Sequence, residues 1–296
     1  MLQIASAEDG IMDIQQIYQK TGYLDGNFRL FHIIDQTRKV FNYHYHDFHK
    51  IVIFLQGNVS YVIEGMQYTV QPNDIILIQA GEIHKPIIHD HSVYDRIIIY
   101  VAEDFFEQSR KDGSDLFQCF QKSRKQHSGL IRIPNWENTP LAAVCRDLAV
   151  SYQCREYASD LYQKVKFTEF LILINRLTAQ ESFRVTDAVT ANPVIQNILK
   201  YINDHLTEED LSIDRIAREA YLNRSYLMHL FKAETGYTIG KYISEKRLFL
   251  ARSYISKGMS VTDACYHSGF KNYTTFYYAY KNKYGASPTQ KPNQEL

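Results

Sequence analysis

The sequence predicts an α+β fold, and three observations carry that prediction. Short β-branched and aromatic runs separated by turn residues fill about 29–101. Helical periodicity replaces them over about 103–183, and two similar helical segments lie in the last third of the chain. We therefore expect two domains joined by a linker, with bounds 1–185, 193–296 and 186–192 respectively.

The β-rich region is expected to form a small barrel or sandwich with flanking helices. Its apolar runs are KIVIFL, VSYVIEG, QYTV, DIILIQ and DRIIIYV, and the turn residues between them include QGN, EGMQ, QPND and AGE. Short strands at this spacing, with no helical pattern between them, are typical of barrels and sandwiches.

Composition indicates a globular protein with an uneven charge distribution. The 296 residues are 45% apolar and 22% charged, with a formal net charge of zero. From Leu211 onward there are 13 Lys and Arg against 6 Asp and Glu, so the last third is basic and the remainder acidic. This favours a polyanion partner for the last third alone, although chance asymmetry on solvated faces explains the charge equally well.

Targeting and membrane signals are not recognisable in the sequence. The first residues lack a basic stretch followed by an apolar one, and the longest apolar runs are too short to cross a bilayer. The four cysteines are scattered, as expected of reduced thiols in a cytoplasm. We therefore expect a cytoplasmic protein.

The helices after the β-rich region carry more apolar surface than one core contact needs. In LYQKVKFTEFLILINRL, Val165, Ile172 and Leu173 lie off the main apolar stripe. Such a helix is either deeply buried or shared with a partner. We expect these helices to pack on the barrel and to form a homodimer contact within about 138–180. The following TDAVTANP has linker composition and ends at Pro193, which can open a helix.

An internal repeat organises the basic third. Leu211 to Gly236 resembles Met259 to Gly285, with offsets of 48 in the first half and 49 in the second. The one-residue change falls where a turn between two helices would lie, so each unit is predicted to be helix, turn, helix. Ser212 and Ser260 are predicted N-caps, and the closing glycines end the second helices. IGKYISEKRLFLARSYIS between the units is predicted to be a connecting helix.

This arrangement suits double-stranded DNA. In a helix-turn-helix, the second helix lies in the major groove and its N-terminal residues meet base edges. Two such helices held at a fixed separation can enter successive major-groove turns, roughly 34 Å apart. The alternative is an unrelated helical bundle with a coincidental repeat.

The region from about Pro193 to Pro288 resembles the DNA-binding domain of the AraC/XylS family of bacterial transcriptional regulators. The resemblance rests on Ile216-Ala217, SYLMHLFKAETG, YISEKRLFLA, GFKNYTTF and YGASP, taken in their order and spacing. One departure is Ala264-Cys265, where a bulkier apolar residue and an alanine are usual. The resemblance implies base contacts from each second helix, by Arg224, Ser225, Met228 and His229 in the first unit and by Asn272, Tyr273, Thr274, Tyr277 and Tyr278 in the second.

The chemistry of these side chains separates two roles. Arg224 can hold guanine in a bidentate pair, and Asn272 can hold adenine in the same way. Lys232, Lys271 and Lys281 suit phosphates, which supply affinity without sequence preference.

The β-rich region resembles, more weakly, the small cupin barrel that often precedes this DNA-binding domain. The matching pieces are HYHDFHK, Gly57 and QPNDIILIQAGEIH. In metal-binding cupins, the HxH pair, a following acid and a later histidine form the metal shell. By spacing these positions hold His44, His46, Lys50 and His84. A protonated lysine is not a ligand and repels a cation, so we expect no metal and no cofactor.

We expect the same residues to form an effector pocket instead. Tyr43, Tyr45 and Tyr61 would offer rings and hydroxyls, the histidines hydrogen bonds, and Lys50 an attraction for an anionic group. The resemblance implies a sugar or related metabolite. Two alternatives stay open: a zinc site of three histidines, with His49 in reserve, or histidines with a structural role only.

The main hypothesis is therefore a non-enzymatic transcription regulator controlled by a small-molecule effector. Its expected partners are promoter DNA, the effector and a second copy of the chain, with RNA polymerase as a further candidate. A metal-dependent cupin enzyme with a DNA-binding appendage is one competing hypothesis. A ligand-independent regulator whose barrel is only a scaffold is the other.

Overall fold

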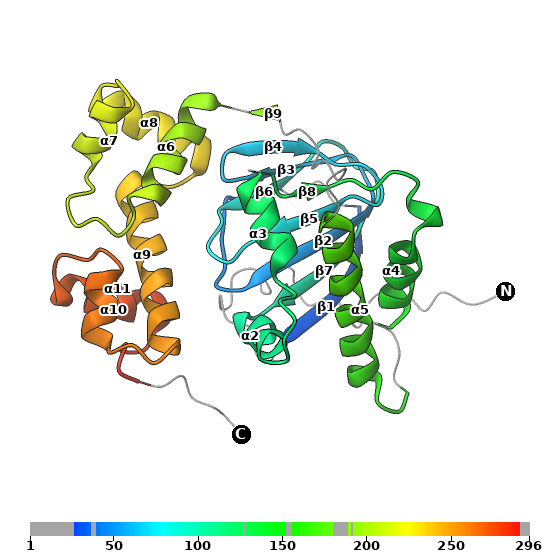
Figure 1. Cartoon of the computed structure of the whole chain (residues 1–296). Coiled ribbons are helices and arrows are strands. Elements are labelled where there is room, and N and C mark those ends of the chain that lie inside the picture. Colours follow the sequence, from blue (N-terminus) through cyan, green and yellow to red (C-terminus); the bar gives the residue numbers. More distant parts are fainter. Residues whose placement is uncertain are drawn as a thin grey trace.

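The computed structural model describes residues 27–36, 40–126, 128–151, 156–179, 189–190 and 192–290. A β-rich half and a helical half lie side by side, as Figure 1 shows. The strands are β1 Phe28–Asp35, β2 His49–Gln56, β3 Val59–Ile63, β4 Met66–Thr69, β5 Ile75–Ile78, β6 His84–Ile88, β7 Tyr94–Val101, β8 Leu130–Ile131 and β9 Val189–Thr190.

The strands form two antiparallel sheets. One has the order β1-β7-β2-β5-β8 and the other β6-β3-β4-β9. Alternate residues of a strand point to opposite faces, so the central strand β2 contributes to two cores. Ile51 and Ile53 join the cluster under the helices, whereas Val52 and Phe54 join the cluster between the sheets. The second cluster is the interior of the barrel.

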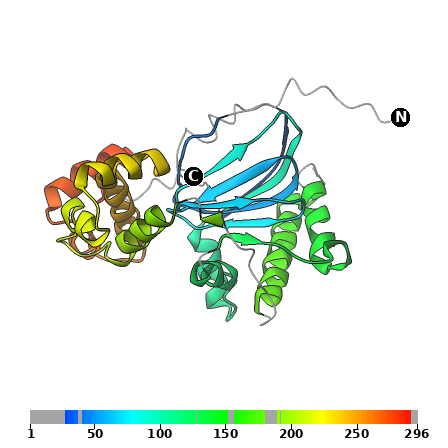
Figure 2. The ribbon, with the colours of Figure 1, turned by 90° about the horizontal axis from the view of Figure 1, so that it is seen from above.

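Helices cover the outer face of the five-stranded sheet, which Figure 2 shows from above. Phe167, Phe170, Leu171 and Ile174 are fully buried in the core that these helices share with the sheet. The helical elements are α2 Glu103–Lys111, α3 Gln118–Lys125, the 3₁₀ turn η1 Trp136–Asn138, α4 Pro140–Ser151 and α5 Ser159–Ala179.

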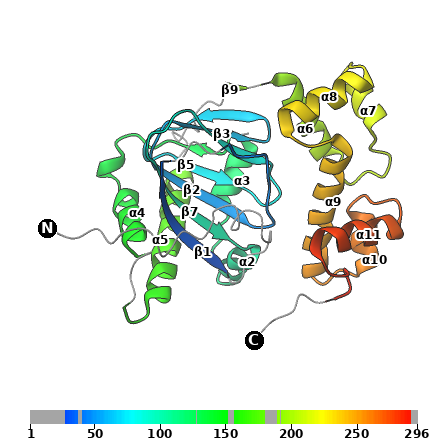
Figure 3. The same ribbon diagram turned by 180° about the vertical axis from the view of Figure 1, so that it is seen from behind.

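The C-terminal half is all helical and has two small cores. The first is built from α6 to α9 and the second from the end of α9 with α10 and α11. Figure 3 shows α9 running between the two groups. The elements are α6 Pro193–Asp204, α7 Ile213–Glu219, α8 Arg224–Thr235, α9 Ile239–Ser256, α10 Val261–His267 and α11 Tyr273–Tyr284.

The predicted α+β class is confirmed, and two short strands modify the expected organisation. β8 lies within the region expected to be helical and pairs with β5. β9 lies within the expected linker and pairs with β4, through Met66 with Thr190 and Gln67 with Val189. Two-residue strands are too short to show periodicity, so sequence patterns miss them. Residues 180–188 lie outside the described part of the chain.

In the part of the chain that the structure describes, every helix is too short or too polar to span a lipid bilayer.

Candidate DNA-reading surface and effector site

The first helix-turn-helix unit is closed by caps at both helix starts. The Ser212 hydroxyl accepts a hydrogen bond from Arg215 N at the start of α7, as predicted. The Asn223 side chain accepts one from Ser225 N at the start of α8. Gly236 ends α8 with a φ of 76°, a left-handed conformation that glycine adopts without a steric penalty.

The second unit repeats this construction. Ser260 caps α10 through Asp263 N, Asn272 caps α11 through Thr275 N, and Gly285 ends α11 with a φ of 70°. The predicted caps and terminating glycines of both units are therefore confirmed. Because Asn223 and Asn272 are 49 positions apart, they occupy equivalent places in the repeat.

The turns between the paired helices share one hydrogen-bond pattern but not one residue. In the first unit Leu222 N donates to Ala217 O, and in the second Phe270 N donates to Cys265 O. Each turn passes through a left-handed residue, which is Tyr221 with a φ of 54° in the first unit and Gly269 with a φ of 93° in the second. Tyr221 is 95% exposed, so no packing explains the strained tyrosine.

The residues predicted to contact DNA share an exposed or half-buried position on or beside α8 and α11. Those classed as exposed are Arg224, Ser225, Met228, His229, Lys232, Lys271, Asn272, Thr274, Tyr278 and Lys281, and those half-buried are Tyr273 and Tyr277. The apolar residues of the same helices, Leu227, Phe231 and Phe276, are fully buried. Each helix therefore has a core face and a polar face that is open to a partner.

Two of these side chains already have partners within the protein. The Arg224 guanidinium pairs with Asp214, with Nη1 2.6 Å from each carboxylate oxygen. Both groups are exposed, so releasing this pair costs little. The Asn272 oxygen caps α11, at 3.1 Å from Thr275 N. A bidentate contact to adenine needs that oxygen, so it would require α11 to lose its cap.

Three histidines meet inside the barrel. His44 and His84 lie opposite each other in a small antiparallel bridge, with N to O distances of 3.1 and 2.9 Å. The ring centroids of His44 and His46 lie 4.4 and 4.7 Å from that of His84. One nitrogen of each ring lies within 4.8 Å of the others. We call these three residues the histidine cluster.

Backbone carbonyls determine the tautomers of two of these rings. His44 Nδ1 lies 2.9 Å from Asn42 O, and His84 Nδ1 lies 3.0 Å from Glu82 O. A carbonyl only accepts, so each Nδ1 carries the hydrogen and each neutral ring keeps its lone pair on Nε2. His46 has both ring nitrogens buried without a hydrogen-bond partner among the described residues.

The electrostatics of the interior keep the histidine cluster neutral. Burial, helped by the charge of Lys50, lowers the pKa of His44 to about 4. Burial also lowers the pKa values of His46 and His84 well below 6.5, with Lys50 again contributing. Lys50 itself is buried, and burial together with the charge of Arg96 lowers its pKa to about 7. The interior therefore disfavours additional positive charge.

Strand alternation separates the predicted effector residues into two groups. Lys50 lies on the same face of β2 as Val52, toward the barrel interior. Tyr61 is also internal, and its hydroxyl lies 2.7 Å from that of Tyr94. Tyr43 and Tyr45 instead pack against the core of α6 to α9. The expectation that they share a pocket with the histidines does not match this arrangement, because they alternate with His44 and His46.

His49 belongs to neither group. Its Nε2 lies 2.8 Å from Glu103, and its Nδ1 accepts a hydrogen bond from Ala80 N. It points toward α2 and α3, so it is not a reserve ligand for the histidine cluster.

The histidine cluster fits part of the metal shell that the cupin resemblance implies. Nε2 lone pairs with Nδ1–H held by carbonyls are the usual state of metal-binding histidines. The acid position is different, because Lys50 stands there and its ammonium form repels a divalent cation. The three histidines therefore fit a metal site, whereas Lys50 does not supply the negative charge that the fourth ligand of such a site provides.

Comparison with known protein families covers both halves of the chain. The model of the AraC-like ligand-binding domain matches residues 30–145, and a helix-turn-helix domain model matches residues 205–293. The chain belongs to the AraC family of transcriptional regulators. The AraC-family chain thus combines a ligand-binding domain with a DNA-binding domain, as an effector-controlled regulator of transcription.

Curated relatives of this AraC-family regulator include the HTH-type transcriptional activator RhaS. The protein from Escherichia coli O157:H7 is 24% identical over 255 residues, which is 83% of this chain and 85% of the relative. RhaS of Shigella sonnei has the same identity and coverage. The relatives are transcription regulators.

Solved structures similar to the regulator include ToxT from Vibrio cholerae O395. That match is 17% identical, covers 89% of this chain and 96% of ToxT, and has a TM-score of 0.35. The C-terminal domain of AraT from Geobacillus stearothermophilus is 21% identical with a TM-score of 0.32, and covers 36% of this chain and 92% of that domain.

Sequence reasoning missed the residues that join the regulator's two halves. Asp47 pairs with Arg252 at 2.6 Å, and Glu64 pairs with Lys246 at 2.9 Å. No local pattern marks them, because each pair joins residues about two hundred positions apart along the chain.

Proposed function

We propose that the regulator reads promoter DNA with the exposed faces of α8 and α11. The observation that carries this proposal is the repeated geometry of two capped second helices, each with a buried apolar face and an exposed polar one. α9 joins the two units, so both can act on one face of the duplex.

Arg224 is the proposed base-reading residue of the first unit. Asp214 orients its guanidinium at the start of α8, the end that enters the groove in helix-turn-helix proteins. Lys232, Lys271 and Lys281 are proposed phosphate contacts. For Asn272 we propose a role as helix cap, with base contact limited to its amide nitrogen.

The test begins with selection of bound fragments from random DNA by the full chain. On the selected site, Arg224→Ala is expected to weaken binding by about 1–3 kcal/mol and to relax preference at one base pair. Lys200→Ala, at an exposed position of α6, is the control. Unchanged affinity and base preference in Arg224→Ala would refute the assignment.

The effector is proposed to bind inside the barrel at the histidine cluster, with Lys50 and Tyr61. Neutral Nε2 atoms accept hydrogen bonds, so they favour a ligand that carries hydroxyl groups. Protonated Lys50 adds a positive charge to the same interior, whereas the charge of Arg96 is paired with Asp35, and the lysine favours an acidic group on that ligand. We infer a small hydroxylated acid. Thermal-shift screening compares sugars with their acid forms, and equal shifts for both would argue against the acidic group.

A metal in the histidine cluster is the second candidate, favoured by the tautomers of His44 and His84. Stoichiometric transition metal in purified protein, lost in His44→Ala, would support it and reopen the hypothesis of a metal-dependent enzyme. We expect substoichiometric metal because of Lys50. No catalytic role is proposed.

Dimerisation is proposed through α5. Leu161, Val165 and Ile172 are 61%, 54% and 37% exposed, and their spacing of four and seven puts them on one stripe of the helix. This stripe is separate from the buried residues of α5, so it is free to meet a second copy of the chain. Val165→Glu is expected to shift sedimentation toward monomer, whereas Lys164→Glu is the control. A dimer unchanged by Val165→Glu would exclude this helix face.

A further inference from the structure

One short segment of the barrel faces both the histidine cluster and the DNA-binding half. Between Tyr43 and Asp47, alternate side chains point to opposite sides. His44 and His46 point inward to the histidine cluster, while Tyr43, Tyr45 and Asp47 point outward. We call residues 43–47 the coupling segment.

The outward side chains contact the C-terminal ends of α8 and α11 and the connecting helix α9. A Cβ at Gly236, which ends α8, would lie 3.2 Å from the Tyr43 ring. Lys283, near the end of α11, hydrogen-bonds the Tyr45 hydroxyl. Arg252 of α9 pairs with Asp47 at 2.6 Å. The barrel therefore touches both DNA-reading units at the ends opposite to the helix starts that carry Arg224 and Tyr273.

Neighbouring turns of the barrel complete this interface. Glu64 accepts hydrogen bonds from the Tyr242 hydroxyl at 2.8 Å and from Lys246 at 2.9 Å. Glu64 also accepts one from Ile83 N, next to His84 of the histidine cluster. At the far end of α9, Lys257 lies 3.9 Å from Glu107 of α2.

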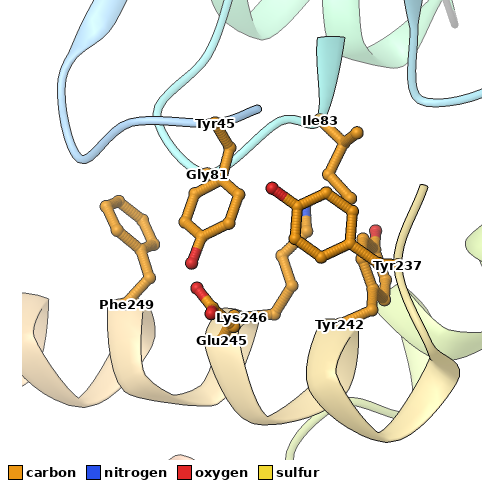
Figure 4. Close-up of a pocket in the computed structure, with 8 residues that line it drawn as sticks. All are labelled: Tyr45, Gly81, Ile83, Tyr237, Tyr242, Glu245, Lys246 and Phe249. Atoms are coloured by element: carbon orange, nitrogen blue, oxygen red, sulfur yellow. The ribbon is translucent and has the colours of Figure 1, made fainter. Parts of the chain in front are cut away.

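The interface combines apolar packing of Tyr43, Tyr45 and Ile83 with polar contacts around a small pocket. Figure 4 shows this small pocket between the barrel turns and α9, lined by Tyr45, Gly81, Ile83, Tyr237, Tyr242, Glu245, Lys246 and Phe249. Ion pairs and hydrogen bonds to tyrosine surround it, whereas the cores on either side are apolar. Polar contacts of this kind are typical of domain interfaces that open and close.

The inward and outward side chains of the coupling segment share one short stretch of backbone. The backbones of His44 and His84 are joined by two hydrogen bonds, so a backbone displacement at either histidine also displaces the residues beside it, Tyr43, Tyr45 and Ile83. All three of these neighbours pack against the core of α6 to α9. A change inside the barrel therefore reaches α9 directly, without involving α4 and α5.

We propose that the coupling segment is the transmission element of the regulator: occupancy of the histidine cluster alters its backbone, and this tightens or releases the hold of the barrel on α9. The inference rests on the proposed effector site. It assigns a function to Tyr43, Tyr45 and Asp47, which lie outside that site. Because α9 carries both reading units, its release changes their positions relative to the barrel together.

The first test uses hydrogen–deuterium exchange on the full chain and needs neither effector nor DNA. Asp47→Asn removes the charge that holds Arg252, so α9 amides are expected to exchange about fivefold faster or more. His46→Gln is expected to accelerate exchange in α9 as well, although His46 points away from it. His46→Phe, which keeps a ring in the interior, is the second variant in case His46→Gln folds poorly.

The matched control is His32→Gln. His32 is a half-buried histidine on β1, paired with Asp95 at 2.8 Å, and it lies outside the coupling segment. Faster exchange in α9 for the His46 variants but not for His32→Gln supports the inference. If both His46 variants leave α9 unchanged, or if Asp47→Asn does, the inference is overturned.

The second test measures affinity for the selected DNA in a double-mutant cycle. Arg252 lies on α9 and pairs with Asp47, whereas His46 points into the barrel, so without transmission the effects of Arg252→Met and His46→Gln multiply independently. Coupling of about fivefold or more is expected, and none is expected for Arg252→Met with His32→Gln. Independent effects in the first pair would overturn the inference. If no DNA is selected by the wild-type chain, the proposed function fails, and the exchange experiment alone decides on transmission.

Discussion

The turns of the two helix-turn-helix units predict opposite effects on stability: a glycine introduced in the first turn should stabilise it, and loss of the glycine in the second should destabilise it. Tyr221 and Gly269 occupy the same place in the repeat, and both have positive φ. The left-handed conformation costs a residue with a side chain about 1–2 kcal/mol. Glycine removes that cost but loses about 0.5–1 kcal/mol to its greater freedom in the unfolded chain. Tyr221→Gly is therefore expected to stabilise the first unit by about 0.5–1 kcal/mol.

The reciprocal change, Gly269→Ala, is expected to be strongly destabilising. An added Cβ would lie 2.7 Å from Leu206 O and 2.9 Å from Arg247 Nε, both closer than real Cβ atoms approach. Arg247 also donates to Leu206 O and Glu208 O, at 2.9 and 2.7 Å. Left-handed strain of about 1–2 kcal/mol and a displaced hydrogen bond of about 1 kcal/mol give a loss of at least about 2 kcal/mol.

The assay is native-state hydrogen exchange, because it reports opening of each unit separately. Amides of α7 and α8 report on Tyr221→Gly, and amides of α10 and α11 report on Gly269→Ala. Tyr221→Ala is the matched control, since it removes the ring but keeps the strain. Stabilisation by Tyr221→Ala equal to that by Tyr221→Gly, or a cost below about 1 kcal/mol for Gly269→Ala, would refute the reasoning.

Three further predictions concern the two sites. Lys232→Ala should weaken binding to all DNA sequences by the same factor and reduce the slope of log affinity against log salt by about 0.9. A loss of affinity that depends on the DNA sequence would contradict a phosphate contact. Asn272→Ala should cost about 1 kcal/mol in urea denaturation while Asn272→Ser retains the cap, and equal losses would argue against capping. The buried histidines have lower pKa values folded than unfolded. The unfolded chain therefore binds more protons between about pH 4 and 6.5, and barrel stability should fall with acidification by up to about 1.4 kcal/mol per pH unit for each histidine. His46→Phe should reduce that slope in urea titrations at pH 5 and 7, and an unchanged slope would place the titration elsewhere.

Local patterns predicted the DNA-binding half well. Caps, terminating glycines and the apolar faces of α8 and α11 depend on residues within a few positions of one another. The strained turn at Tyr221 was also within reach, because the 48-residue offset aligns it with Gly269. Because glycine often marks a left-handed residue in a turn, Gly269 in the second unit could have indicated the left-handed conformation of Tyr221 in the first.

The barrel was predictable only in part. The cupin spacing named His44, His46 and His84 together, and in the structure alternation keeps the first two on one face while the bridge to His84 brings in the third. The same alternation implied that Tyr43 and Tyr45 face the other way, but their partner is a helix some two hundred residues later. Sequence patterns carry no information about which loops a second domain covers. For that reason the ion pairs of Asp47 and Glu64 emerge only from the tertiary structure.

The alternation between Tyr43 and Asp47 also limits how this stretch can change in length. Connections between strands usually tolerate insertions and deletions, because they lie at the surface. Here one residue added or removed between His44 and His46 would exchange the inner and outer sets of side chains beyond that point. Imidazoles would then meet α9, and a tyrosine would enter the barrel. Substitutions can alter this stretch one position at a time, whereas a single-codon deletion would disturb ligand binding and domain docking together.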